Sequence, residues 1–155
     1  MPSRSFPLLL VMFCGACAPT AQPASTPGTK TSPDLQAAEI DGAFPMMRKD
    51  TAIVLELSTE GARLEAAYSD STLRRLRAEY LGETGRATDT FYFDSVLFLV
   101  VRGSVSYDAP LSGHAADSTT TRFDLRSDST PPSQRDSLRA AARTLLVHIA
   151  SAQKR

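Results

Sequence analysis

Hydrophobic and polar residues alternate along the middle of the chain with a period of two, the pattern of half-buried strands. From residue 51 to 57, Ile53, Leu55 and Leu57 take the hydrophobic positions, which predicts a strand with these residues on its buried side. After a glycine-containing turn, residues 62–68 repeat the alternation and predict a second strand.

Residues 72–81 fit two kinds of secondary structure. Leu76, Ala78 and Tyr80 alternate with charged residues as they would in a strand. The hydrophobic positions also fall on one helix face, and arginine and leucine favour helices. A tight-turn candidate at 70–71 precedes the segment and another turn follows it, so the sequence favours a strand and leaves a helix as the alternative.

The most hydrophobic part of the chain predicts a hairpin, with strands at 88–93 and 96–102 on either side of a turn at Asp94-Ser95. The run Val96–Val101 is apolar at every position, so both faces of its strand should be covered. We expect a helix on one face. The other face could be covered by a second helix, a bent sheet or a partner molecule.

The sequence beyond this hairpin is more polar. Residues 104–107 continue the meander, residues 108–120 are expected to form a polar loop, and residues 121–125 a last short strand with Phe123 and Leu125 inward.

One helix is expected at each end of the strands. A short helix should run from Asp34 to about Phe44 with Ser32 as its cap, and a longer one, with Ser133 as its cap, should run to about Ala152. The hydrophobic stripe of the longer helix consists of Leu138, Ala142, Leu145 and Ile149. The expected fold is therefore α+β: an antiparallel meander of about five to six strands, with a short N-terminal helix and a longer C-terminal helix packed on the sheet.

Residues 1–16 have the layout of an export signal, with Arg4 before an apolar run at 6–13 that is too short to span a bilayer. The sequence Cys14-Gly15-Ala16-Cys17 then resembles the lipobox of bacterial lipoproteins, except that Cys14 stands where leucine is usual. The resemblance implies that Cys17 becomes the lipidated first residue of the mature chain. With Ala18 after it, the resemblance also implies the periplasmic face of the outer membrane.

Two other interpretations of the leader remain open. An ordinary secretory peptidase could cut near Cys17 and release the chain into the periplasm, although Pro19 disfavours this cut. The spacing Cys14-x-x-Cys17 also matches a redox motif, but such a motif needs the N-terminus of a folded helix to activate its thiolate.

Residues 17–33 are expected to form a tether between the lipid and the domain. Four prolines among Ala, Ser and Thr cannot bury enough apolar surface to fold. At about 3.1 Å per residue, the stretch from 18 to 33 could hold the domain roughly 50 Å from a lipid surface. The expected organisation is a signal peptide at 1–16, a tether at 17–33 and one domain at 34–155.

Charge and cysteine usage exclude several functions. The 17 basic and 17 acidic residues give no basic patch large enough for nucleic acid, and cleavage before Cys17 removes only Arg4 from this balance. Both cysteines lie in the first 17 residues, so the domain has no internal disulfide. With two separated histidines and no cysteine, we expect neither a transition-metal site nor a cofactor in the domain.

Few residues are candidates for catalysis. His114 lies near Asp117 and Ser118 in the expected polar loop, and His148 lies beside the stripe of the last helix, so a hydrolase using His114 is the weakest of three hypotheses. Arg74, Arg75 and Arg77 form a basic cluster, which is either a solvated strand face or a contact for anionic groups. The expected surface contacts are Arg75, Arg77, Tyr107 and His114.

The strand–turn–strand repetition at 51–107 resembles meanders of many uncharacterised bacterial envelope proteins, in motifs such as Gly82-Glu83-Thr84-Gly85 and Tyr92-Phe93-Asp94. This resemblance covers about a third of the chain and implies an antiparallel sheet, but no activity. We therefore expect a lipid-anchored, non-enzymatic envelope protein that contacts the membrane through Cys17 and another envelope protein through its domain. The alternative is a carrier or sensor of a small apolar ligand bound between sheet and helix.

Overall fold

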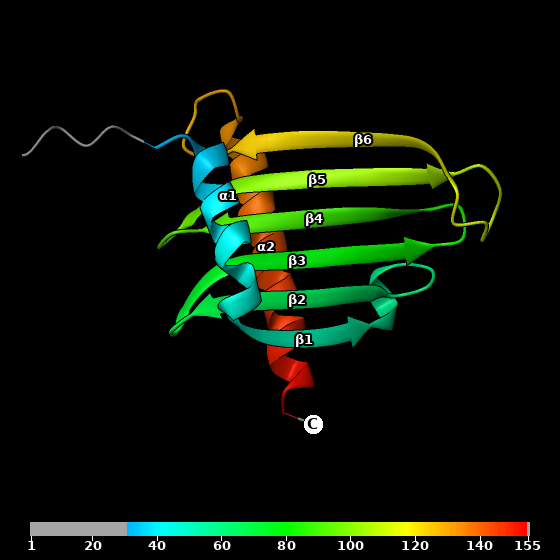
Figure 1. The fold of residues 1–155 in the computed structure, drawn as a ribbon, viewed down its shortest axis with the longest axis horizontal. Coiled ribbons are helices and arrows are strands. Elements are labelled where there is room, and N and C mark those ends of the chain that lie inside the picture. Colours follow the sequence, from blue (N-terminus) through cyan, green and yellow to red (C-terminus); the bar gives the residue numbers. More distant parts are fainter. Residues whose placement is uncertain (1–30, 155) are drawn as a thin grey trace, which may run out of the picture. The chain divides into compact units, whose positions relative to one another are not determined.

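The computed structural model describes residues 31–154, which form a six-stranded antiparallel sheet with one α-helix on each face. The strands pair in sequence order, so the sheet is a meander (Figure 1). The strands are β1 (Arg48–Val54), β2 (Ala62–Ser69), β3 (Thr72–Gly82), β4 (Gly85–Phe93), β5 (Leu97–Tyr107) and β6 (Ala115–Asp124). The expected α+β fold is confirmed; the leader, Cys17 and most of the tether lie outside the described residues.

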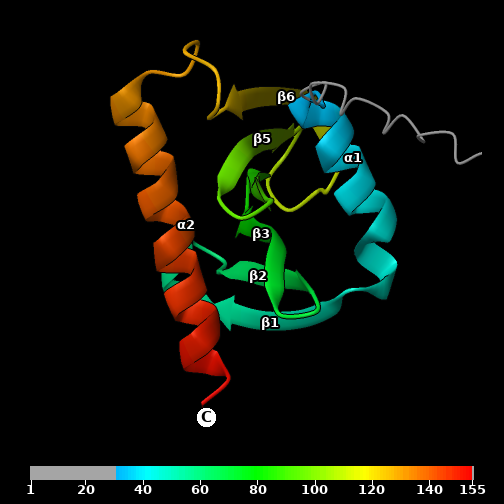
Figure 2. The same ribbon diagram turned by 90° about the vertical axis from the view of Figure 1, so that its left-hand side faces the viewer.

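The long helix α2 (Pro132–Ala152) packs on one face of the sheet (Figure 2). Its buried residues are Leu138, Ala142, Leu145 and Ile149, the stripe that the sequence predicts. They join one cluster with small and branched sheet residues, among them Ala66, Ala78 and Leu64. Large side chains such as Phe91 and Leu76 fill the same cluster, so small and large residues together pack this face against the helix.

The short helix α1 (Pro33–Ala43) covers part of the opposite face, where Ala37 and Ile40 pack against Tyr92, Phe98 and Leu99. The start of β5 therefore has a helix on both faces. A bulge makes this possible: Phe93 pairs with Leu97 and Tyr92 with Leu99, so Phe98 is the extra residue between them. Of the three covers left open by the sequence, the second helix is the one observed.

The predictions for residues 72–81 and for the turns on either side of them are confirmed. Residues 72–81 lie within β3, not in a helix. Asp70 takes a positive φ of 55° in the turn between β2 and β3, and Glu83-Thr84 connects β3 to β4. An aspartate tolerates this left-handed conformation better than most residues.

The first strand differs from its prediction in both its buried side and its length. Ala52 and Val54 are buried, whereas Ile53 and Leu55 are 74% and 72% exposed. The register places Ala52 opposite Leu64 and Val54 opposite Ala62, so the smaller residues face α2. The strand ends at Val54, and residues Leu55–Leu57 form the 3-10 turn η2. Packing against α2 therefore determines which side of β1 is buried, although Ile53 is larger than Ala52.

The last strand is longer than predicted, because residues 115–120 of the expected polar loop belong to β6. The backbone of β5 continues to Tyr107 and provides hydrogen-bonding partners for residues 115–124. Eight consecutive residues of β6 are exposed, so this part of the strand shows no hydrophobic alternation. Phe123 and Leu125 pack into the core as predicted. Val96, which is expected in the buried run 96–101, lies in the turn before β5 and is exposed.

The expected serine caps are replaced by prolines in the first turns. Ser32 is at the N-cap of α1 but makes no side-chain cap hydrogen bond. The second helix begins at Pro132, with Pro131 at its N-cap, so Ser133 lies inside its first turn. Proline suits the first helical turn because that turn has unsatisfied N–H groups in any case.

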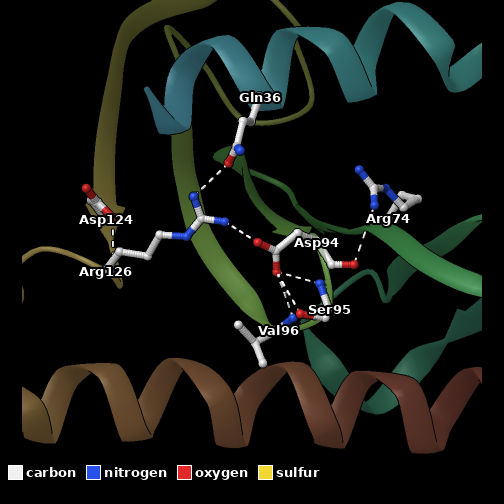
Figure 3. A network of polar contacts seen from close by, with 7 residues as sticks. All are labelled: Gln36, Arg74, Asp94, Ser95, Val96, Asp124 and Arg126. Carbon is white, nitrogen blue, oxygen red and sulfur yellow. Dashed lines mark hydrogen bonds and ion pairs between the residues drawn. The ribbon is translucent and has the colours of Figure 1, made fainter. Parts of the chain in front are cut away.

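An ion pair between Asp94 and Arg126 joins the β4–β5 turn to the segment after β6 (Figure 3). Arg126 Nη1 also donates to Gln36 Oε1 of α1 at 2.7 Å, and its guanidinium lies 4.5 Å from the centre of the Phe98 ring. Burial raises the pKa of Asp94, but hydrogen bonds from the backbone N–H groups of Val96 and Ser95, together with Arg126, outweigh this and hold it below its ordinary value.

Gly85 is the glycine at which a side chain has no space. A Cβ at this position would overlap the carbonyl oxygen of Val105 in β5, which is backbone and cannot rotate away. We expect Gly85→Ala to lower the free energy of unfolding by about 1–3 kcal/mol, measured by urea denaturation.

Gly103→Ala is the matched control within the sheet. Its Cβ would make only an ordinary contact, 3.8 Å from the carbonyl oxygen of Thr119. Equal loss of stability in the two variants would contradict the close packing between Gly85 and Val105.

Candidate interaction surface

The face of the sheet that carries α1 is only partly covered (Figure 1). The helix crosses the strands near the β4–β5 turn, and the strands extend well beyond it. The uncovered part of this face is the candidate functional site, which we call the open sheet face. By strand alternation from Arg75 and Tyr92 beneath the helix, it includes Arg77 and Glu79 of β3 and Thr88 of β4.

Polar contacts hold α1 in place beside this surface. The Tyr92 hydroxyl donates to Asp41 Oδ2 at 2.9 Å, and Arg75 Nε lies 3.5 Å from Asp41 Oδ1. Burial is the main cause that raises the pKa of Tyr92, to about 12, and the hydrogen bond to Asp41 adds to it. The end of α1 is therefore tied to the centre of the sheet.

Phe44, directly after α1, lies against two cations. The Arg75 guanidinium and the Lys49 ammonium are each 4.3 Å from the centre of its ring. Such contacts are worth about 0.5–2 kcal/mol each, more when they are desolvated. Only 14% of the Arg75 side chain is exposed, so this residue stabilises the helix and offers little surface to a partner.

The three arginines of the predicted basic cluster point to different places. Arg74 Nη1 donates to the carbonyl oxygen of Asp94 at 3.4 Å, and Arg75 lies under α1. Arg77 reaches the open sheet face, where its Nη2 lies 4.0 Å from Glu79 Oε1. The structure therefore brings together no single basic patch from these residues, and Arg77 is the member that remains available for contact.

Charges of both signs alternate across the neighbouring strands β2 and β3. Arg63 is directly opposite Glu79, and Glu65 is directly opposite Arg77. Among residues 31–154, neither of these directly opposed pairs approaches to within 4.0 Å. The guanidinium and carboxylate groups of these two opposed pairs therefore do not bond to each other, as they would in a row of cross-strand ion pairs.

The surface is hollowed at these charges. A hollow of about 640 Å³ is lined by Thr51, Ala52, Ile53, Arg63, Leu64, Glu65, Arg77, Glu79 and Ala152. Ile53, one of the most exposed large hydrophobic residues, stands at its β1 side. The hollow therefore places one exposed apolar side chain beside two arginines and two carboxylates.

Tyr107 and His114, the other two predicted contacts, lie away from the hollow. Tyr107 ends β5 and is half-buried, and the side chain of His114 is 83% exposed in the loop that follows. His114 Nδ1 is 3.8 Å from Asp108 Oδ2, and the Ser112 hydroxyl donates to Asp108 Oδ1 at 2.5 Å.

This loop lacks the arrangement of a nucleophilic triad. The carboxylate of Asp108 stands between Ser112 and His114, whereas activation of a serine requires the histidine in that position. Asp117, the partner that the sequence suggested for His114, instead accepts a hydrogen bond from the backbone N–H of Ser118.

Between the sheet and α2 there is a smaller cleft, of about 240 Å³, beside the β4–β5 turn. Its lining residues are Phe93, Val96, Leu97, Arg139, Ala142, Arg143 and Leu146. Pockets for small ligands commonly exceed about 300 Å³. This cleft gives the ligand-carrier hypothesis no specific support.

Asp89 and Arg102 form a partly buried contact that no sequence motif indicates. Asp89 is 5% exposed and receives two hydrogen bonds from Arg102, at 2.7 and 2.9 Å. The hydrogen bonds to Asp89 raise the pKa of Arg102 above its ordinary value. The only sequence signal for this pair is an aspartate on one strand and an arginine on the next. It can be recognised only once the register between β4 and β5 is known.

Within the described part of the chain, no group of three or more His, Cys, Asp or Glu residues is placed to hold a metal ion. None of the helices at 31–154 is both long and apolar enough to cross a membrane. Comparisons with protein-family models, characterised proteins and solved structures found no match.

Tyr92→Phe tests the anchoring of α1. A tyrosine with a pKa near 10 when unfolded and about 12 when folded stabilises the domain fully below pH 10, and this stabilisation is lost as the pH rises through 12. Between pH 9 and 12 the wild type should therefore lose about 2 kcal/mol of unfolding free energy that the variant does not lose. Urea titrations at each pH measure it.

Tyr80→Phe is the control, because the pKa of Tyr80 is also raised but its hydroxyl does not contact α1. Parallel pH profiles for the wild type and Tyr92→Phe would show that the Tyr92–Asp41 bond does not anchor the helix.

Proposed function

We propose that this protein is a lipid-anchored, non-enzymatic component of the bacterial envelope, which binds a partner protein through the open sheet face. The lipidated Cys17 would hold the domain at a membrane, on the tether that ends where α1 begins. The domain would then act as an interaction module at the periplasmic face of the outer membrane.

The observation that carries this proposal is the hollow over β1–β3. It combines the exposed Ile53 with Arg63 and Arg77. A guanidinium group can form bidentate hydrogen bonds with a carboxylate of a partner. Glu65 and Glu79 add acceptors of the opposite sign. A partner surface with complementary charges around an apolar side chain fits this chemistry, and opposite charges on both sides would give specificity and fast association.

Crosslinking in cells, followed by identification of the captured partner, tests this surface. We expect the double charge reversal Arg63→Glu with Arg77→Glu to reduce partner recovery by about tenfold or more, equivalent to about 1.4 kcal/mol of binding free energy. Arg77 is half exposed and Arg63 is exposed, so the domain should remain folded.

The matched control reverses two exposed arginines on α2, Arg139 and Arg143, which lie on the other face of the sheet. This variant should recover the partner as the wild type does. Equal recovery by both double variants would exclude the open sheet face as the binding surface.

The anchor is tested separately by fractionation. The wild type should partition with membranes and Cys17→Ser should not, provided that its leader is cleaved, which the mass of the protein establishes. Release of unmodified wild-type protein into the soluble fraction would overturn the anchoring by Cys17, whatever the crosslinking shows.

A further inference from the structure

We propose that two copies of this chain associate through β6, which pairs antiparallel with β6 of a second copy and joins the two sheets. The contact is independent of the proposed partner surface, because β6 is at one edge of the sheet and β1 is at the other.

The outer edge of β6 is a long row of backbone hydrogen-bonding groups, regular from Asp117 to Asp124 and interrupted by a bulge at Ala116. The strand has ten residues, contains neither proline nor lysine, and has exposed side chains at eight consecutive positions. Natural sheets usually protect their edges with lysine, proline, short strands or covering elements. Figure 1 shows both helices toward the Asp124 end of β6, and neither runs along its edge.

The other edge strand is protected. β1 has seven residues, begins with Arg48-Lys49, and is followed directly by the 3-10 turn η2. The end of α2 at Ala152 lies near its outer side, at the hollow that both elements line. The contrast between the two edges indicates β6 as the strand that accepts another strand.

The sequence of β6 is compatible with antiparallel pairing to itself. A two-fold axis at Thr119 places Thr119 opposite its own copy, Ser118 opposite Thr120, and Asp117 opposite Thr121. Threonine and serine facing each other across strands contribute roughly 0.2–1 kcal/mol per pair.

Charge also favours the antiparallel direction. Asp117 and Arg122 lie at opposite ends of the central hydroxyl-bearing stretch. In a parallel, in-register pair each would meet its own copy, and like charges directly opposite are destabilising. In the antiparallel pair Asp117 is opposite Thr121, so neither charge meets its own copy. A second copy therefore fits this edge better in the antiparallel direction than in the parallel one.

A cysteine at the two-fold axis tests the pairing. Thr119→Cys is made in the full-length protein, which has no cysteine after residue 17, and membranes are treated with a mild oxidant. A disulfide between the two copies of residue 119 is expected, because facing residues of paired strands bring their Cβ atoms within reach of one. Non-reducing gels should show at least about fivefold more dimer than Thr51→Cys, an exposed position on β1.

The register has its own test. Ser118→Cys and Thr120→Cys, expressed together, should give more dimer than either expressed alone, because these residues face each other in the pair. Dimer formation by Thr119→Cys no greater than by Thr51→Cys, in protein with an unchanged thermal transition, would overturn the proposal. So would a disulfide crosslink from the Thr119→Cys variant to a protein of different mass.

A lysine introduced at the edge provides a test without cysteine. Thr119→Lys should convert a dimer, measured by sedimentation in detergent, into a monomer with the same thermal transition, while Thr51→Lys should leave the dimer intact. A wild type that is monomeric under these conditions would also overturn the proposal. Partner recovery through Arg63 and Arg77 should persist in Thr119→Lys, which separates this contact from the proposed function.

Discussion

The architecture depends on the start of β5, where the strand is buried on both faces. Leu97 and Val100 face the cluster under α2, while Phe98 and Leu99 face α1, and the bulge at Phe98 brings two consecutive large residues onto the α1 side. A strand of this kind is stable only when both faces exclude water. Both helices are therefore needed at this end of the sheet, and Arg126 closes the same corner by contacting both Phe98 and Asp94.

The sequence predicts best where one physical effect dominates. The stripe from Leu138 to Ile149 has a helical period on an amphipathic segment, and each of its members is buried as expected. In β1 two effects compete: Ile53 is larger than Ala52, but the closely packed α2 accommodates the smaller residue. In β6 residues 115–122 are all exposed and show no side-chain pattern, so pairing with the backbone of β5 defines that part of the strand.

The candidate site was only partly predictable, because it depends on register and on where a helix stops. Arg75 and Arg77 are equivalent in the sequence, yet one lies beneath α1 and the other lies beyond it. The opposition of Arg63 to Glu79 appears only when β2 and β3 are paired. The sequence predicts Ile53 on the buried side of β1, but Ala52 takes that side. Ile53 is therefore on the open sheet face, where it lines the hollow.

Pairing through β6 would change what the open sheet face can do. A two-fold axis perpendicular to the sheet keeps the faces of both copies in the same orientation, so the two hollows would open in the same direction. Each lies at β1–β3, the far edge from the β6 contact, so neither would be obstructed. A dimer could then bind a partner that presents two sites, and the second binding event would occur at the high effective concentration set by the first. A modest affinity at each hollow would suffice for stable attachment, which suits a surface whose charges remain partly solvated.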